Sequence, residues 1–264
     1  MFATSIWLII SELYFMKLLT LNLVSLLLIS GSFNSQKSER VSEPIAVIEL
    51  FTSQGCSSCP SADKLLSNLV ASADGKEIYA LSFHVSYWNR LGWTDPYSSE
   101  QFTQRQRKYG TVMNLQTIYT PQMVVNGEYE FVGSSKTKAD YYLEKALLKP
   151  ADVNITLKNV DIKNGLLSFQ YSLDEEGKDN LLNVAIVEKQ VENHVPRGEN
   201  RGLTLKHENV VIQYKTINVN NSGLVNLELE ASVDLKDCSL IVYLQDKKSL
   251  KIYGASKMEF GSNN

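Results

Sequence analysis

The sequence predicts two successive domains, an α/β domain over residues 45–149 and an all-β, sandwich-like domain over residues 150–260. Between residues 45 and 149, apolar runs typical of buried strands alternate with stretches of helical periodicity. After Pro150, the apolar residues recur with period two in short segments separated by turn sequences. The length of 264 residues also suits one or two domains of about 100–200 residues each.

The first predicted domain contains its elements in the order β-α-β, insertion, β-β-α. The insertion spans residues 86–115 and is rich in aromatic and polar side chains. The expected elements are a strand at 45–51, a helix at 60–71, a strand at 78–85, a helix at 99–109 inside the insertion, a hairpin with its turn at Asn126-Gly127, and a helix at 136–148. This order predicts a compact α/β domain with a helical and aromatic insertion.

Short strands with alternating apolar residues make up the second predicted domain. They are expected at 153–157, 166–171, 182–187, 210–214, 224–229 and 240–244. Turn sequences such as Lys163-Asn164-Gly165 separate them. The regular spacing of strands and turns predicts a β-sandwich.

Two cysteines, Cys56 and Cys59, lie between the first expected strand and the first expected helix. A C-x-x-C motif in this setting is typical of a thioredoxin-like redox site. The N-terminus of a helix favours a thiolate, so Cys56 is the candidate nucleophile and Cys59 the residue that resolves a mixed disulfide. The motif therefore predicts thiol–disulfide exchange by a thioredoxin-like α/β domain, without a cofactor.

Two other roles for the cysteine pair are open. One is a structural disulfide, although a loop this short constrains the unfolded chain little. The other is a zinc site, which needs four ligands; only three histidines and Cys238 are available besides the pair, so we expect no metal. In an oxidising compartment the pair is expected to be joined, and Cys238 is expected to be a small buried apolar residue.

Two further residues are candidates for the catalytic site. Pro121 follows Thr120 and leads into an apolar run. Thioredoxin-like proteins have a cis proline at such a position, beside the active cysteines, where it forms a docking edge for an extended substrate. An ordinary trans turn proline is the alternative. Glu49 is the one acid in the first expected strand, and a buried acid there would accept the proton of Cys59. Otherwise Glu49 points outward or pairs with a lysine.

The insertion has the composition of a binding surface. Trp88 and Trp93, together with Thr120, are the candidates for substrate binding, since tryptophan is favoured at recognition sites. The alternative for the tryptophans is a hydrophobic plug packed on the domain. His84, at a strand end, is expected to be a structural histidine. The polar loop at 194–202 contains two arginines and a glutamate, which would bind a carboxylate, face the other domain or form a solvated loop.

Residues 1–32 have the pattern of a signal peptide, with Lys17 followed by an apolar stretch and cleavage expected near Ser32. Met16 is a plausible true start, and residues 33–44 are expected to be a flexible lead-in. Export would place the protein in the periplasm or outside the cell. The alternative is an uncleaved N-terminal anchor, which would be its only contact with a membrane.

The motifs together resemble those of the DUF1223 family, exported bacterial proteins assigned to the thioredoxin-like superfamily. The resemblance covers roughly residues 45–250 and implies a thioredoxin-like fold with dithiol chemistry, but no particular substrate. It rests on Leu50-Phe51-Thr52-Ser53-Gln54-Gly55-Cys56-Ser57-Ser58-Cys59-Pro60, Ala62-Asp63, His84-Val85, Tyr87-Trp88, Leu91-Gly92-Trp93-Thr94-Asp95-Pro96, Arg105-Gln106, Tyr119-Thr120-Pro121-Gln122-Met123-Val124-Val125-Asn126-Gly127 and Arg197-Gly198-Glu199-Asn200.

The sequence thus predicts an exported thiol–disulfide oxidoreductase whose partners are protein or small-molecule thiols and disulfides. The alternative is a non-catalytic binding module with a structural disulfide on the same scaffold. The net charge of -3 and the lack of a basic patch exclude nucleic-acid binding from the expected functions.

Overall fold

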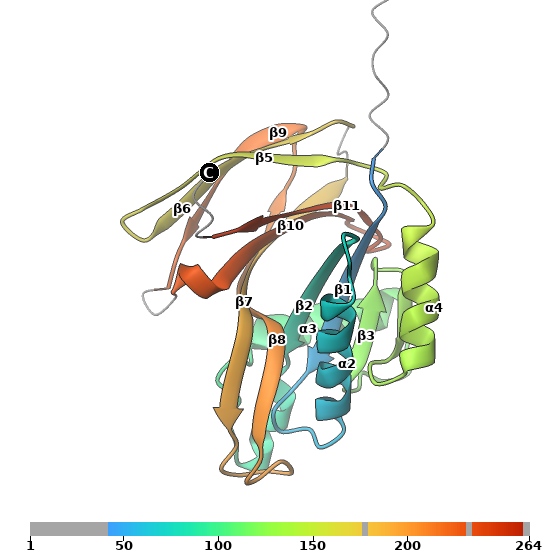
Figure 1. The fold of residues 1–264 in the computed structure, drawn as a ribbon, viewed down its shortest axis with the longest axis vertical. Coiled ribbons are helices and arrows are strands. Elements are labelled where there is room, and N and C mark those ends of the chain that lie inside the picture. Colours follow the sequence, from blue (N-terminus) through green and yellow to red (C-terminus); the bar gives the residue numbers. More distant parts are fainter. Residues whose placement is uncertain (1–41, 176–178, 231–233, 261–264) are drawn as a thin grey trace, which may run out of the picture. The chain divides into compact units, whose positions relative to one another are not determined.

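Strands dominate the chain, and they form two sheets (Figure 1). The computed structural model describes residues 42–175, 179–230 and 234–260. The larger sheet has eight strands in the order β11-β10-β7-β8-β2-β1-β3-β4, and the smaller has the order β5-β6-β9. The predicted signal peptide at 1–32 and most of the predicted lead-in at 33–44 lie outside the described residues.

The elements have the following bounds: β1 Ile45–Thr52, α2 Cys59–Ala71, β2 Glu77–His84, the 3-10 helix η1 Ser86–Leu91, α3 Glu100–Val112, β3 Gln122–Val125, β4 Tyr129–Val132, α4 Lys136–Leu147, β5 Ile155–Lys163, β6 Leu166–Leu173, β7 Asn180–His194, β8 Thr204–Asn218, β9 Ser222–Glu228, the 3-10 helix η2 Leu235–Asp237, β10 Cys238–Asp246 and β11 Ile252–Glu259. Most were predicted, with differences at their ends; η1, η2 and β11 were not. In the part of the chain described, no helix is both long and apolar enough to cross a membrane.

The prediction of a thioredoxin-like α/β domain followed by a separate all-β sandwich was wrong. β8 pairs in parallel with β2 through Ser82 and Val210, so strands from both sides of Pro150 belong to one mixed sheet. The physical reason for the single sheet is that its strands are buried on both faces. In β10, for example, the eight residues from Cys238 to Gln245 are all buried. Alternating sequence patterns identify strands, but they do not specify which sheet each strand joins.

β1 lies inside the large sheet, and its side chains alternate between two cores. Ala46, Ile48 and Leu50 pack with the apolar sides of α2 and α4. Val47 and Phe51 point to the opposite face and pack with residues of β2, α3, β7, β8 and β10. Each such buried aliphatic or aromatic side chain contributes roughly 1.5–3 kcal/mol to folding. The two cores fix the end of β1, where the cysteine loop begins.

A third core joins the two sheets. Apolar residues of β7 and β10 pack against β6 and β9 of the small sheet. Cys238 belongs to this core and is 1% exposed, as predicted for a small buried residue. Its pKa is raised to about 11 by burial and by the nearby acids Glu188, Asp234 and Asp237.

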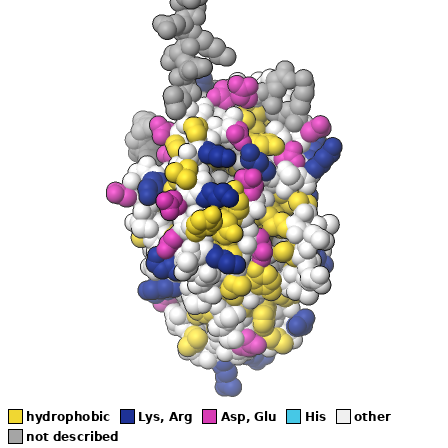
Figure 2. All heavy atoms as spheres, turned by 90° about the vertical axis from the view of Figure 1, so that its right-hand side faces the viewer, with side chains coloured by type: hydrophobic (Ala, Val, Ile, Leu, Met, Phe, Trp, Pro, Cys, Tyr) yellow, Lys and Arg dark blue, Asp and Glu magenta, His cyan; other side chains and the backbone are white. Residues whose placement is uncertain are grey.

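The face that carries α4 shows a band of hydrophobic side chains among scattered basic and acidic ones (Figure 2). The exposed hydrophobic residues include Val132 of β4, Tyr141 of α4 and Leu148 just after α4. β4 is an edge strand of the large sheet. These three residues are distant in sequence from Cys56 and Cys59.

Candidate functional site

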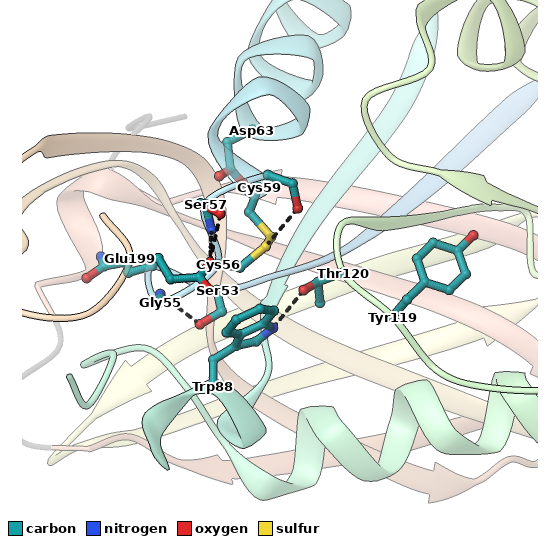
Figure 3. The surroundings of a disulfide bond; sticks show 12 residues. Ser53, Gly55, Cys56, Ser57, Cys59, Asp63, Trp88, Tyr119, Thr120 and Glu199 are labelled. Carbon is teal, nitrogen blue, oxygen red and sulfur yellow. Dashed lines mark hydrogen bonds between the residues drawn. A yellow bond between two sulfur atoms is a disulfide. The ribbon is translucent and has the colours of Figure 1, made fainter. Parts of the chain in front are cut away.

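Cys56 and Cys59 form a disulfide at the point where the chain passes from β1 to α2 (Figure 3). Cys59 is the first residue of α2. Both cysteines are 0% exposed, whereas Ser57 and Ser58 between them are exposed. The pair therefore lies beneath its own serine turn, and a reagent reaches the serines before the sulfurs.

Local hydrogen bonds shape the disulfide loop, residues 53–59. The amide of Cys56 donates to the carbonyl of Ser53 at 3.2 Å, and Ser58 Oγ lies 3.3 Å from Cys56 Sγ. Gly55 permits close packing, since a Cβ there would lie 3.1 Å from the Cβ of Trp88. The loop thus depends on the aromatic insertion for its support.

The loop between β7 and β8 covers the disulfide loop. Glu199 accepts hydrogen bonds from the amide of Ser57 at 3.0 Å and from its hydroxyl at 2.7 Å, and these two bonds lower the pKa of Glu199. Asn200, only 3% exposed, donates to the carbonyls of both Gln54 and Cys56 at 2.9 Å. The predicted polar loop at 194–202 therefore contacts the cysteine region directly.

The Thr120–Pro121 peptide bond is cis, as predicted. A Cβ on Gly133 would lie 3.2 Å from Pro121 Cβ and 3.3 Å from Ala62 Cβ, which places the proline near the first turn of α2. Trp88 Nε1 donates to Thr120 Oγ1 at 2.7 Å (Figure 3). The structure thus brings Trp88, Thr120 and Pro121 together with the cysteines.

Trp93 also lies beside the disulfide loop, because its Nε1 donates to Gln54 Oε1 at 3.2 Å. The amide of Gln54 in turn donates to Asp95 Oδ2 at 2.8 Å. Asp95 also contacts His84, with 2.7 Å between Oδ2 and Nδ1. His84 is fully buried, and through Asp95 it is connected to the disulfide loop.

Glu49 contacts side chains of α3. Its carboxylate is held by Arg105, with Nε–Oε2 and Nη2–Oε1 distances of 2.5 and 2.7 Å, and by the Tyr109 hydroxyl at 2.7 Å. Glu49 follows the alternation of Val47 and Phe51 along β1, so it points away from α2. An ion pair with a lysine was one of the three arrangements predicted for Glu49; the observed partner is Arg105.

Sequence reasoning assigned no role at the site to three buried polar residues near the disulfide: Asp63, Asp95 and His207. Asp63 lies on α2 one turn after Cys59, and the ring of His207 from β8 packs on His84 with centroids 4.7 Å apart. The chain has only three histidines, and this small number was the signal that could have drawn attention to His207. Among residues 42–175, 179–230 and 234–260, no three His, Cys, Asp or Glu side chains are arranged to hold a metal.

Among the solved structures that are similar to this chain, a protein from Agrobacterium tumefaciens has a similar fold. The crystal structure of protein AGR_C_4864 from Agrobacterium tumefaciens is 24% identical, with a TM-score of 0.62 over 84% of this chain and 97% of that one. A domain of the outer membrane lipoprotein Omp28 from Porphyromonas gingivalis is 11% identical, with a TM-score of 0.27 over 41% of this chain and 95% of that one.

No curated protein matches the chain significantly. A family model does match, over residues 47–245, and its description reads "Protein of unknown function (DUF1223)". The match includes the disulfide loop, the insertion and the covering loop between β7 and β8. The chain therefore belongs to the DUF1223 family.

Proposed function

We propose that this chain is an exported, non-catalytic binding protein in which the Cys56–Cys59 disulfide is structural. One observation carries the proposal: the two cysteines are 0% exposed, and Asn200 ties the loop above them to the backbone of Cys56. Thiol–disulfide exchange needs a thiolate to attack one sulfur directly. The covered sulfurs support a disulfide that fixes the loop rather than one that exchanges.

The 3-10 helix η1 and the β7–β8 loop, which contact the disulfide loop, carry a surface that is suited to binding. We call it the tip surface and define it as Arg90, Leu91, Arg197, Arg201 and Leu203. Leu91 and Leu203 are 41% and 49% exposed, and the three arginines are exposed. Exposed leucines next to arginines are suited to a partner that combines apolar and acidic groups.

The two parts of the tip surface lie against each other. A Cβ on Gly198 would lie 3.7 Å from Trp93 Cβ and 4.0 Å from the carbonyl oxygen of Leu91. In the part of the chain described, none of Arg90, Arg197 and Arg201 forms an ion pair. Their charges are therefore available to a partner.

A redox titration tests the structural role of the disulfide. The intact protein is equilibrated with glutathione mixtures, and free thiols are counted by mass after alkylation. We expect a reduction potential below about −300 mV, as for structural disulfides. A potential near −200 mV, or reduction within minutes by millimolar glutathione, would contradict the proposal.

The tip surface is tested with a fluorescent peptide of alternating glutamate and leucine, by anisotropy at low salt. We expect binding that is lost in Arg197→Glu/Arg201→Glu. Lys158→Glu/Lys163→Glu, on β5 of the small sheet, makes the matched change in charge elsewhere and should bind normally. Equal loss in both variants would show a general charge effect and no tip surface.

A second candidate is the predicted thiol–disulfide exchange, with Cys56 attacking and Cys59 resolving. The observation that favours it is the setting: the disulfide begins α2, and Pro121 and Thr120 lie beside it. The covering loop would have to move before reaction. In Cys59→Ser the Cys56 thiolate should then attack disulfides of partner proteins, release one partner thiol and accumulate as a mixed disulfide, whereas Cys56→Ser should form no such adduct. Absence of such adducts in Cys59→Ser would exclude this candidate.

A further inference from the structure

Four ionisable side chains form a buried row beside the disulfide loop, in the order Asp95, His84, His207, Asp63. They come from the insertion, the end of β2, β8 and α2. Their exposures are 1%, 0%, 2% and 3% in the same order. The row therefore connects the β7–β8 hairpin to the helix that begins at Cys59.

The distances along the row show two different kinds of contact. His84 Nδ1 lies 2.7 Å from Asp95 Oδ2 in a hydrogen bond. The rings of His84 and His207 meet edge to face with centroids 4.7 Å apart. His207 Nδ1 lies 3.4 Å from Asp63 Oδ2, close enough for charges to attract but without hydrogen-bond geometry.

The inner half of the row lacks hydrogen bonds. In the part of the chain described, neither oxygen of Asp63, neither ring nitrogen of His207, nor Nε2 of His84 has a hydrogen-bond partner. A buried carboxylate without donors is costly unless a nearby positive charge compensates it. The histidines nearest to Asp63 are His207, 3.4 Å away, and His84, whose ring packs on that of His207.

Asp95 is satisfied independently of Asp63. It accepts hydrogen bonds from the amides of Gln54 and Tyr97 as well as contacting His84. Loss of the histidine protons would therefore destabilise Asp63 most, because its carboxylate would then lie beside neutral rings. Of the groups around Asp63, His207 is the one on the hairpin, and its movement away would let water reach the carboxylate.

We propose that this buried row is a proton-dependent latch: protonated histidines hold the β7–β8 hairpin against α2, and their deprotonation releases the hairpin loop from the disulfide loop. The latch would regulate the tip surface, because Arg197, Arg201 and Leu203 lie on the same hairpin loop. Only this regulation of the tip surface rests on the proposed binding function. The movement itself can be measured without any partner.

The electrostatics give the direction of the response. Burial opposes the charged form of His84, but the charge and hydrogen bond of Asp95, with the charge of Asp63, raise its pKa above the ordinary 6.5. A histidine of raised pKa stabilises the closed state fully below about 6.5 and loses that effect as the pH rises through the raised value.

The other titrating neighbours do not reverse this direction. Burial favours neutral Asp95, but His84 and the backbone amides of Gln54 and Tyr97 lower its pKa below the ordinary 3.8, so it stays ionised near neutral pH. Tyr97, whose ring contacts His84, has its pKa raised by burial and by Glu188 and Asp95. The latch is thus closed at mildly acidic pH and loosens as the pH rises, by up to about tenfold in the closed-to-open ratio per pH unit for each proton released.

Amide hydrogen exchange of residues 195–203, followed by mass spectrometry from pH 5 to 9 and corrected for intrinsic rates, tests the latch in the intact oxidised protein. In the wild type, protection should fall as the pH rises above about 6.5, by at most about tenfold per unit for each proton released, and should level off above the raised pKa of His84. His194→Gln alters the third histidine, which is exposed at the end of β7, and should keep the wild-type profile.

Two variants separate a latch from ordinary packing. Asp63→Asn removes the charge that needs compensation, so the loop should stay protected at pH 9. His207→Gln cannot be protonated, so exchange at pH 5 should rise to the alkaline level. A wild-type profile that is flat with pH, or an unchanged slope in Asp63→Asn, would overturn the proposal, and Asp63→Asn decides alone if His207→Gln does not fold. Failure of the acidic peptide to bind would affect the proposed function and leave this result intact.

Discussion

Arg105 and Glu49 form an ion pair inside the large sheet, with side-chain exposures of 9% and 0%. The guanidinium also lies 5.2 to 5.6 Å from the centres of four aromatic rings. Removing one partner leaves the other as an uncompensated buried charge. We therefore expect Arg105→Ala to lower the free energy of unfolding by about 3–5 kcal/mol in urea titrations.

Arg107, two residues away on α3, provides the matched control. Its side chain is 52% exposed, and its contact with Glu100 spans 3.8 Å. Arg107→Ala should change the free energy of unfolding by no more than about 0.5 kcal/mol. Similar decreases in the free energy of unfolding of the two variants would show that the Arg105–Glu49 pair stabilises the fold no more than a surface contact does.

Asn200 should protect the disulfide from reduction. Asn200→Ala removes donors from two buried carbonyls, those of Gln54 and Cys56, at a cost of about 1–3 kcal/mol. The loop should open more often, and dithiothreitol should reduce Cys56–Cys59 at least several-fold faster under native conditions, as measured by thiol alkylation. Asn220→Ala, at an exposed position, should be reduced at the wild-type rate.

Position 127 requires glycine for two reasons, its backbone conformation and its close contact with Leu250. Its φ is +67°, and a Cβ there would overlap the carbonyl oxygen of Leu250, next to β11. Gly127→Ala should therefore lower the thermal midpoint substantially, by more than the roughly 1 kcal/mol expected for the backbone alone. Gly75, with φ +76° and no atom within 4 Å of its Cβ position, isolates that backbone effect. An equal shift in Gly75→Ala would mean that the contact with Leu250 adds nothing.

The stability of the whole chain should decrease on the alkaline side. Because Asp95 and Asp63 raise the pKa of His84 against the effect of burial, the folded state holds this proton more tightly than the unfolded state. The free energy of unfolding should fall above about pH 6.5, by at most about 1.4 kcal/mol per pH unit. Asp95→Asn should flatten this dependence, measured by urea unfolding at pH 5 to 9, whereas His194→Gln should not.

The sequence predicted local structure well where one segment suffices to specify it. The hairpin turn at Asn126-Gly127 was predicted and is observed, with both residues at positive φ. The cis bond before Pro121 and the disulfide between strand and helix were also predicted and observed. In each case the residues involved are close in sequence, and their chemistry restricts the backbone.

Long-range pairing was not predictable in the same way. The polar ends of β7 and β8 gave no strong strand signal, although both strands are 15 residues long. Nothing in the alternation around Val210 indicated β2 as its partner. For the same reason the sequence did not decide whether Glu49 accepts the proton of Cys59, points outward or pairs with a lysine. The observed partner is Arg105, which lies on the other face of β1. Register and facing depend on tertiary contacts that a pattern within one segment does not contain.

The pairing of β2 with β8 has a consequence for the order of events during synthesis. The first half of the chain can form β1, β2, β3 and β4, but the other edge of β2 has no strand beside it until β8 has been made. A growing chain gains roughly 5–20 residues per second, so this edge stays open for seconds while β5 to β8 are added. An unpaired edge strand is a template for intermolecular pairing. The nascent protein therefore has its greatest tendency to aggregate before its second half is complete, and a chaperone that shields β2 in that interval would raise the yield of folded protein.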